Sequence, residues 1–161
     1  MANPFPAIAT DLGRTIAQAK PMLTQLTNAD TTLRPSPKKW AKKEILGHLL
    51  DSASNNHQRF VRAALQGSLT FPNYEQEELV KLQRYREMDW GFLVDHWASY
   101  NRFLAHVLSV LPAKAAKAKC KIGSNKPAAL AWGADDYVEH LKHHLNQIVG
   151  ERFPSKYGLT V

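Results

Sequence analysis

Four stretches of the chain carry apolar residues at every third or fourth position, the spacing that places side chains on one face of a helix. They cover residues 5–26, 37–66, 90–111 and 127–149, and a shorter helical pattern lies at residues 75–86. No segment alternates strongly between apolar and polar residues, as a half-buried strand would. Because each apolar stripe must be buried against its neighbours, the pattern predicts an all-α four-helix bundle, with residues 1–161 as a single domain.

Proline, glycine and capping residues suggest where these helices begin and end. Ser36 followed by Pro37 has the order of an N-cap and a first helical residue, and Gly67 suits the position after a last turn. Pro127 is placed to open the last helix. Pro21 predicts a kink or a break in the first helix, because proline removes a backbone hydrogen bond there.

The segments between the helices are rich in turn-forming residues. Residues 28–37 read as a loop, and residues 113–126 as a basic loop. The connection after the second helix begins with residues 67–73 and is too long for a tight turn. Long loops often border functional sites, so we expect it to form a lid. Residues 153–161 are expected to pack as an extended strap.

Composition and charge narrow the class of protein. Apolar residues make up 44% and charged residues 22%, which excludes a disordered chain, and the net charge of +7 favours acidic partners or simply solubility. No leader-like segment or stretch of about 20 apolar residues is present, so we expect a cytoplasmic protein with no membrane partner. Cys120 is the single cysteine, which excludes an intramolecular disulfide and indicates an incidental thiol in an exposed loop.

Three of the seven histidines have positions that suit a metal site. His140 and His144 are four residues apart, so both project from one helix face and can reach one divalent ion at about 2.0–2.1 Å. His48 lies among leucines of the second helix, where a buried imidazole needs a partner. Three histidines from two helices leave coordination positions open, as in catalytic metal sites. The alternative is a buried polar network without a metal.

Polar residues near these histidines could orient the imidazoles. Asp51 and Asn55 follow His48 on the same side of the helix, and Asp136 and Gln147 flank the pair on the last helix. His143 points about 100° away from its neighbour and is expected at the rim. The other histidines are expected to be partly exposed: His57, His96 and His106.

Two strings of the sequence resemble the DinB-like superfamily, and especially its YfiT-like branch. They are WAKKEILGHLLDSASNNHQRF at residues 40–60 and DYVEHLKHHLNQI at residues 136–148, and FPNYEQ at 71–76 and LSVLP at 108–112 are also similar. The resemblance implies a four-helix bundle, often dimeric, with one divalent metal ion bound by His48, His140 and His144. Nickel or zinc is the expected ion.

We therefore expect a metal-dependent enzyme acting on a small-molecule substrate. In a hydrolase the ion would act as a Lewis acid or activate water, with Asp51 or Asp136 as the catalytic base. The alternative within this class is a thiol-dependent S-transferase, in which Arg59 or Arg62 would bind an anionic cosubstrate. Both activities occur among the relatives that the resemblance suggests, and the residues leave the choice open.

The substrate pocket is expected between the second and last helices and residues 67–76. Asn55 lies two turns beyond His48 and points the same way. The expected substrate contacts are Asn55, Asn56, Tyr74 and Gln76.

A non-catalytic binding module, for nucleic acid or in a stress response, is the alternative outside the enzymes. Two basic stretches could contact nucleic acid: Lys38, Lys39, Lys42 and Lys43, and Lys114, Lys117, Lys119 and Lys121. The first stretch precedes a helix, where cations oppose the helix dipole. No helix-turn-helix or RNP-like string accompanies them, so we do not expect a nucleic-acid partner.

Aromatic residues predict a homodimer, because they exceed what one small core requires. Those concerned are Trp90, Trp97, Tyr100 and Phe103 in the third helix, with Trp40 and Trp132.

Overall fold

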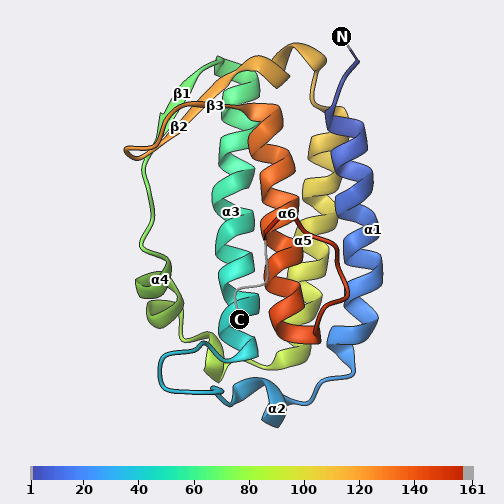
Figure 1. Cartoon of the computed structure of the whole chain (residues 1–161), viewed down its shortest axis with the longest axis vertical. Coiled ribbons are helices and arrows are strands. Elements are labelled where there is room, and N and C mark those ends of the chain that lie inside the picture. Colours follow the sequence, from blue (N-terminus) through green and yellow to red (C-terminus); the bar gives the residue numbers. More distant parts are fainter. Residues whose placement is uncertain (1, 158–161) are drawn as a thin grey trace.

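Four long helices stand side by side in the structure, a computed structural model that describes residues 2–157 (Figure 1). They are α1 (Phe5–Thr24), α3 (Lys42–Gln66), α5 (Trp90–Val110) and α6 (Leu130–Val149). Each buries the apolar stripe that its periodicity predicts, and the stripes meet in one core that includes Leu12, Leu49, Trp97 and Leu145. The predicted four-helix bundle is confirmed.

Shorter elements connect these helices. They are α2 (Asn28–Thr32), β1 (Leu69–Phe71), α4 (Gln76–Gln83), the 3-10 helices η1 (Tyr85–Glu87) and η2 (Ala113–Lys117), β2 (Lys119–Ile122) and β3 (Ala128–Ala129). None of the helices in residues 2–157 is both long enough and apolar enough to cross a membrane.

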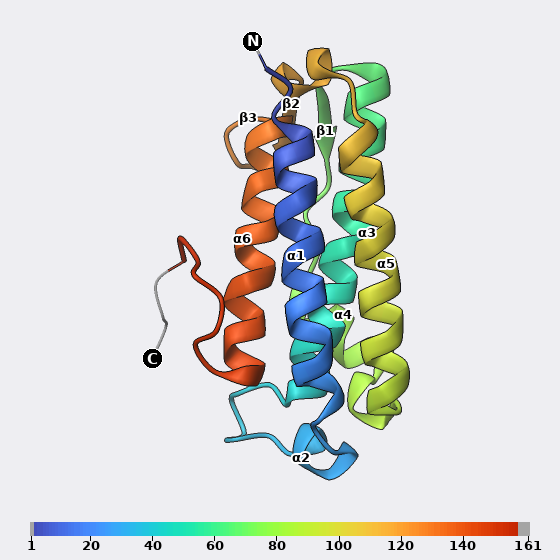
Figure 2. The same cartoon turned by 90° about the vertical axis from the view of Figure 1, so that its right-hand side faces the viewer.

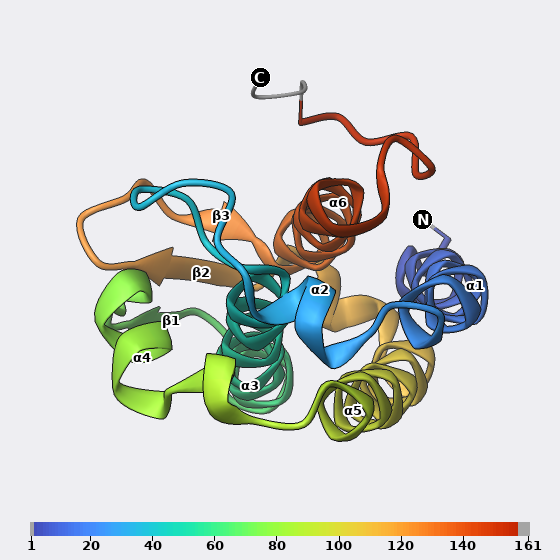
Figure 3. The same cartoon turned by 90° about the horizontal axis from the view of Figure 1, so that it is seen from below.

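The four long helices form a ring in which neighbours along the chain are not neighbours in space. Seen along the bundle, α1 packs between α5 and α6, and α3 packs between the same two helices (Figure 3). Helices α1 and α6 run in one direction and α3 and α5 in the other (Figures 1 and 2). The connection after α3 therefore returns along the whole bundle through β1 and α4, which is the long connection that the sequence indicates.

A small three-stranded sheet accompanies the helices at one end of the bundle (Figure 1). Strand β1 pairs with β2 in parallel, Leu69 opposite Cys120, and β2 pairs with β3 in antiparallel fashion. Strands β1 and β2 lie within residues expected to be loops and β3 within residues expected to be helical, because two to four residues are too few to show a period of two. Cys120 is consequently half-buried on β2 and not in an exposed loop. The sheet joins the connection after α3 to the connection before α6.

Two helix starts differ from the prediction. Helix α3 begins at Lys42, and residues 36–39 form a turn in which the Lys39 N–H donates to the Ser36 carbonyl at 3.1 Å. The capping interaction comes instead from Glu44, whose Oε2 accepts the Ala41 N–H at 2.8 Å. The last helix begins at Leu130, three residues after Pro127, because β3 precedes it.

The end of α3 and the start of the C-terminal strap agree with the prediction, whereas α1 does not break at its proline. Gly67 ends α3 with φ +86°, a conformation that favours glycine. Helix α1 continues through Pro21 to Thr24, so the helix does not break there. Phe153 is buried, and its backbone N–H donates to the Asn146 side chain at 2.9 Å, which secures the start of the predicted strap. The end of that strap, residues 158–161, lies outside the described residues.

Candidate metal centre

Three imidazoles converge between α3 and α6. His48 projects from the buried face of α3, and His140 and His144 project from one face of α6. The Nε2 of His140 lies 3.3 Å from that of His48 and 3.1 Å from that of His144, and one ligand nitrogen from each residue lies within 4.8 Å of the others. The structure thus brings together the three histidines that the sequence singled out.

These separations fit a shared ion. Nitrogens bound at about 2.1 Å to one tetrahedral or octahedral ion lie about 3.0–3.4 Å apart. Both close Nε2 separations fall within that interval.

The imidazoles are in the form that binds metal. Burial, together with the charges of neighbouring histidines, lowers the pKa of His48 to about 4 and that of His140 to about 3. Burial also lowers the pKa of His144, although the hydrogen bond with Gln147 works in the opposite direction. All three are therefore neutral at pH 7, and a neutral imidazole is the metal ligand.

A metal-free hydrogen-bond network accounts poorly for the cluster. His144 Nδ1 lies 2.8 Å from Gln147 Oε1, an acceptor, so its proton sits on Nδ1 and its Nε2 carries a lone pair. His140 Nε2 must then donate to His144, and the same single N–H would have to be shared with His48. His48 Nδ1 is buried with no hydrogen-bond partner within residues 2–157. A cation among the three Nε2 atoms would bind the lone pair of each imidazole, so the donor set fits a divalent ion.

A hollow of about 600 Å³ reaches the cluster at His144. It is lined by Pro35, Lys38, Lys39, Trp40, Ile45, Glu77, His144 and Gln147. Helices α3 and α6 border it, as expected, whereas Glu77 of α4 and the segment 35–40 line it in place of the predicted residues 67–76. That segment has no periodicity that could indicate which way its side chains point.

Two of the four expected substrate contacts lie near this hollow. Tyr74 and Gln76 line an adjoining hollow of about 440 Å³, which shares Trp40 and Glu77 with the first. The Tyr74 ring also packs under the Arg59 guanidinium, 5.9 Å from the ring centroid.

The two asparagines bond within their own helix. Asn55 Nδ2 donates to the Asp51 carbonyl and Asn56 Nδ2 to the Ser52 carbonyl, each at 2.9 Å. Neither lines the two hollows beside the histidines.

The two expected catalytic carboxylates are engaged by tyrosines. Asp51 Oδ1 accepts from Tyr85 Oη and Gln83 Nε2, each at 2.7 Å. Burial raises the pKa of Asp51 although both bonds act to lower it. Asp136 accepts from Tyr157 Oη, and the Tyr157 ring lies 6.3 Å from that of His140. Neither carboxylate lines the hollow at His144, so their catalytic role stays a prediction.

The remaining histidines lie outside the cluster. His143 lies beside Gln147, 3.3 Å away, and beside the Tyr157 ring. As expected, the other three are at least partly exposed: His57, His96 and His106.

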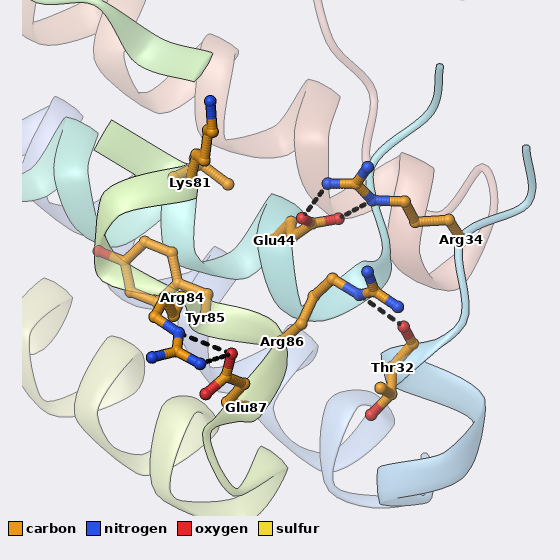
Figure 4. Close-up of a pocket in the computed structure, with 9 residues that line it drawn as sticks. Thr32, Arg34, Glu44, Lys81, Arg84, Tyr85, Arg86 and Glu87 are labelled. Atoms are coloured by element: carbon orange, nitrogen blue, oxygen red, sulfur yellow. Dashed lines mark hydrogen bonds and ion pairs between the residues drawn. The ribbon is translucent and has the colours of Figure 1, made fainter. Parts of the chain in front are cut away.

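An ion pair holds the segment 35–40 beside the cluster. The Arg34 guanidinium forms two hydrogen bonds with the Glu44 carboxylate in the first turn of α3 (Figure 4). Glu44 also caps the helix through Ala41, so both ends of the segment are tied to α3. The pair lines a separate hollow of about 420 Å³ whose lining includes no histidine.

Comparisons with known proteins bear on the family and the fold of this chain. A family model of the DinB superfamily matches residues 11–148. The solved structure of YfiT from Bacillus subtilis superposes with a TM-score of 0.78 and 18% sequence identity, covering 89% of this chain and 83% of that one. YfiT is described as a probable metal-dependent hydrolase with an unusual four-helix bundle topology. At this identity the likeness shows the fold alone. The comparison with curated proteins found no match.

Proposed function

Because the chain belongs to the DinB superfamily and three imidazoles converge beside an open hollow, we propose that it is a metal-dependent hydrolase of a small molecule. His48, His140 and His144 would hold one divalent ion, nickel or zinc. The observation that carries the proposal is the convergence of three neutral imidazoles whose two close Nε2 contacts would have to share a single N–H in the absence of a cation. The description of YfiT as a probable metal-dependent hydrolase supports the same reaction class.

Two residues that line the hollow at His144, Gln147 and Glu77, would have distinct roles in the reaction. When bound, a divalent ion supplies Lewis acidity, which polarises a carbonyl or phosphoryl oxygen and lowers the pKa of water. Gln147 Oε1 accepts a hydrogen bond from the His144 Nδ1–H and so keeps the Nε2 lone pair directed at the cluster. Glu77 is the one carboxylate among the residues that line this hollow, and we assign it the transfer of a proton from water.

Elemental analysis and a hydrolysis screen test this proposal together. Protein purified without an affinity tag should contain one divalent ion per chain. It should hydrolyse a member of a panel of esters and amides, with activity lost in His48→Ala. Turnover that requires an added thiol would instead identify an S-transferase. Absence of metal, with no thermal stabilisation by zinc or nickel, would overturn the proposal.

Three carboxylate variants identify the base. Glu77→Gln should lower kcat by about 100-fold or more while the metal content stays unchanged. Asp51→Asn and Asp136→Asn are the matched comparisons, and a larger loss in either would return the role of base to that residue.

A further inference from the structure

Lys38 and Lys39 lie where cations disfavour a helix. They precede the first turn of α3, whose free backbone N–H groups already carry positive potential. Neither ammonium group has a carboxylate within 4 Å in the described part of the chain. Helix stability therefore does not explain these two lysines.

Both lysines line the hollow that reaches His144. Glu77 supplies one negative charge to the lining against their two positive charges, so the hollow is cationic even without a metal. The N-terminus of α3 adds to that potential. Such a hollow attracts anions.

Trp40 adds an aromatic surface next to this charge. It lines the hollow at His144 and the adjoining one, and its ring centroid lies 5.2 Å from that of His48. An indole that is only half-buried offers a face on which a flat apolar group can stack.

The segment that carries these three residues is held in shape before any ligand arrives. Arg34 and Ala41 attach its two ends to Glu44, and the hydrogen bond between Lys39 and Ser36 closes a turn within it. A binding loop that is already ordered loses less conformational entropy on binding.

We propose that the hollow beside the histidines binds a small anion with a flat apolar body, an aryl carboxylate or aryl phosphate. Lys38 and Lys39 pair with its oxyanion, and its body stacks on Trp40. As a statement about substrate class, this inference rests on the proposed function. Anion binding itself depends on the two lysines and is expected in the metal-free protein as well.

Titrations followed by NMR test the anion site in protein freed of metal with a chelator. Benzoate and phenyl phosphate are the charged probes, which separate carboxylate from phosphate recognition, and benzamide is their neutral counterpart. The Trp40 indole N–H signal should shift saturably with at least one charged probe and far less with benzamide. The Lys38→Gln/Lys39→Gln variant should weaken that binding about five- to tenfold.

A second double variant provides the control. Lys114→Gln/Lys117→Gln removes the same charge from η2, at the opposite end of the bundle (Figure 1), and should leave the affinity within about twofold. Equal weakening by both variants would mean that only net charge matters and would overturn the proposal. Equal affinity for benzamide and benzoate, or no shift at Trp40, would also overturn it.

A parallel zinc titration separates this inference from the proposed function. If zinc does not bind but anion binding still depends on the two lysines, the proposed function fails and the anion site stands. If zinc binds and the lysine variant binds both anions as tightly as the wild type, the anion site fails alone.

Discussion

At the scale of residues, each of the three histidines should contribute far more to metal binding than their neighbour His143. Replacing His48, His140 or His144 with alanine removes a ligand and should weaken zinc binding more than about 100-fold. His143→Ala should leave the affinity largely unchanged, because the His143 ring lies at the edge of the cluster beside Tyr157. Isothermal titration with zinc measures both effects. A loss in His143→Ala equal to that in His144→Ala would show that the ligand assignment is wrong.

The pH dependence follows from the lowered pKa values of the buried histidines. The pKa of His48 is about 4 and that of His140 about 3, against 6.5 for an exposed imidazole. Below pH 6.5 the unfolded chain binds more protons than the folded chain. The metal-free protein should therefore lose stability steadily as the pH falls from 6.5 towards 4, as urea unfolding would measure.

The same pKa values place the loss of metal affinity at a lower pH than exposed histidines would. Protons compete poorly for imidazoles that stay neutral, so zinc affinity should change little between pH 7 and pH 6 and fall below about pH 5. Zinc titrations at pH 7, pH 6 and below about pH 5 measure this change in affinity. A tenfold loss between pH 7 and pH 6 would contradict it.

How far single residues could be predicted depends on periodicity. The three histidines were predictable because helical spacing determines which side chains share a face, and burial then brings the faces together. Lys39, Trp40 and Glu77 were not assigned to the hollow. Two of them lie in an irregular segment, and the third lies on a short helix whose partner depends on the path of the long connection.

At the scale of elements, Gly47 allows η1 to pack directly on α3. A Cβ at Gly47 would lie 2.1 Å from the Tyr85 ring, whose hydroxyl donates to Asp51 one turn further along α3. Gly47→Ala should therefore force the ring away and destabilise the protein by about 1–3 kcal/mol. Thermal or urea unfolding measures the change.

Gly13 provides the matched control for that substitution. It lies within α1, and apart from the backbone of its own helix and its two chain neighbours no atom of residues 2–157 comes within 4 Å of an added Cβ, so Gly13→Ala should stabilise the protein by about 0.5–1 kcal/mol. If both alanine variants shift stability in the same direction, close packing of Tyr85 is not the cause.

The ion pair between Arg34 and Glu44 should stabilise the start of α3. Burial alone would raise the pKa of Glu44, but hydrogen bonds from Arg34 and the Ala41 N–H together lower it. Glu44 therefore stabilises the fold above its unfolded pKa, near 4.5, and this contribution is lost as the pH falls. Arg34→Ala should cost about 1–2 kcal/mol at pH 7, since Glu44 is 5% exposed but Arg34 is 38% exposed.

An exposed pair provides the comparison for this prediction. Arg14 pairs with Asp11 while its side chain is 65% exposed, so Arg14→Ala should change stability by less than about 0.5 kcal/mol. Urea unfolding at pH 7 and pH 4 should show the Arg34 effect shrinking at the lower pH. An effect independent of pH would rule out the charge on Glu44 as its source.

Long elements were predictable and short ones were not. The long helices repeat their apolar period over five or more turns, whereas β1 and β3 have three and two residues. The start of α3 was wrongly placed at Pro37 because Ser36 and Pro37 form a local turn that imitates an N-cap. The capping hydrogen bond from the Ala41 N–H to Glu44 marks the actual start, and alanine is not a residue type that indicates an N-cap in a sequence.

At the scale of the whole molecule, fewer aromatic residues favour a homodimer than the sequence alone suggests. Trp90 and Trp97 are buried in the chain's own core, whereas Phe92 and Phe103 on α5 and Trp132 on α6 are 48–60% exposed. We predict a dimer through the outer face of α5, since exposed aromatic residues are enriched at interfaces. Light scattering should give twice the 18.1 kDa of one chain.

A charged variant on that face tests the dimer. Phe103→Glu should shift the protein towards the mass of one chain, while Trp132→Glu, on another helix, should leave the dimer intact. A wild-type mass near 18.1 kDa at micromolar concentration would exclude the dimer.

The ring order of the helices has a consequence for synthesis on the ribosome. Helices α1 and α3 lie on one diagonal, so the first two long helices to emerge have little of each other's surface to bury (Figure 3). Each finds a partner only when α5 appears, and α6 then completes both pairs. The apolar faces of α1 and α3 therefore stay exposed until more than two thirds of the polypeptide has been made. During that time they can bind chaperones or the same helices of other nascent chains.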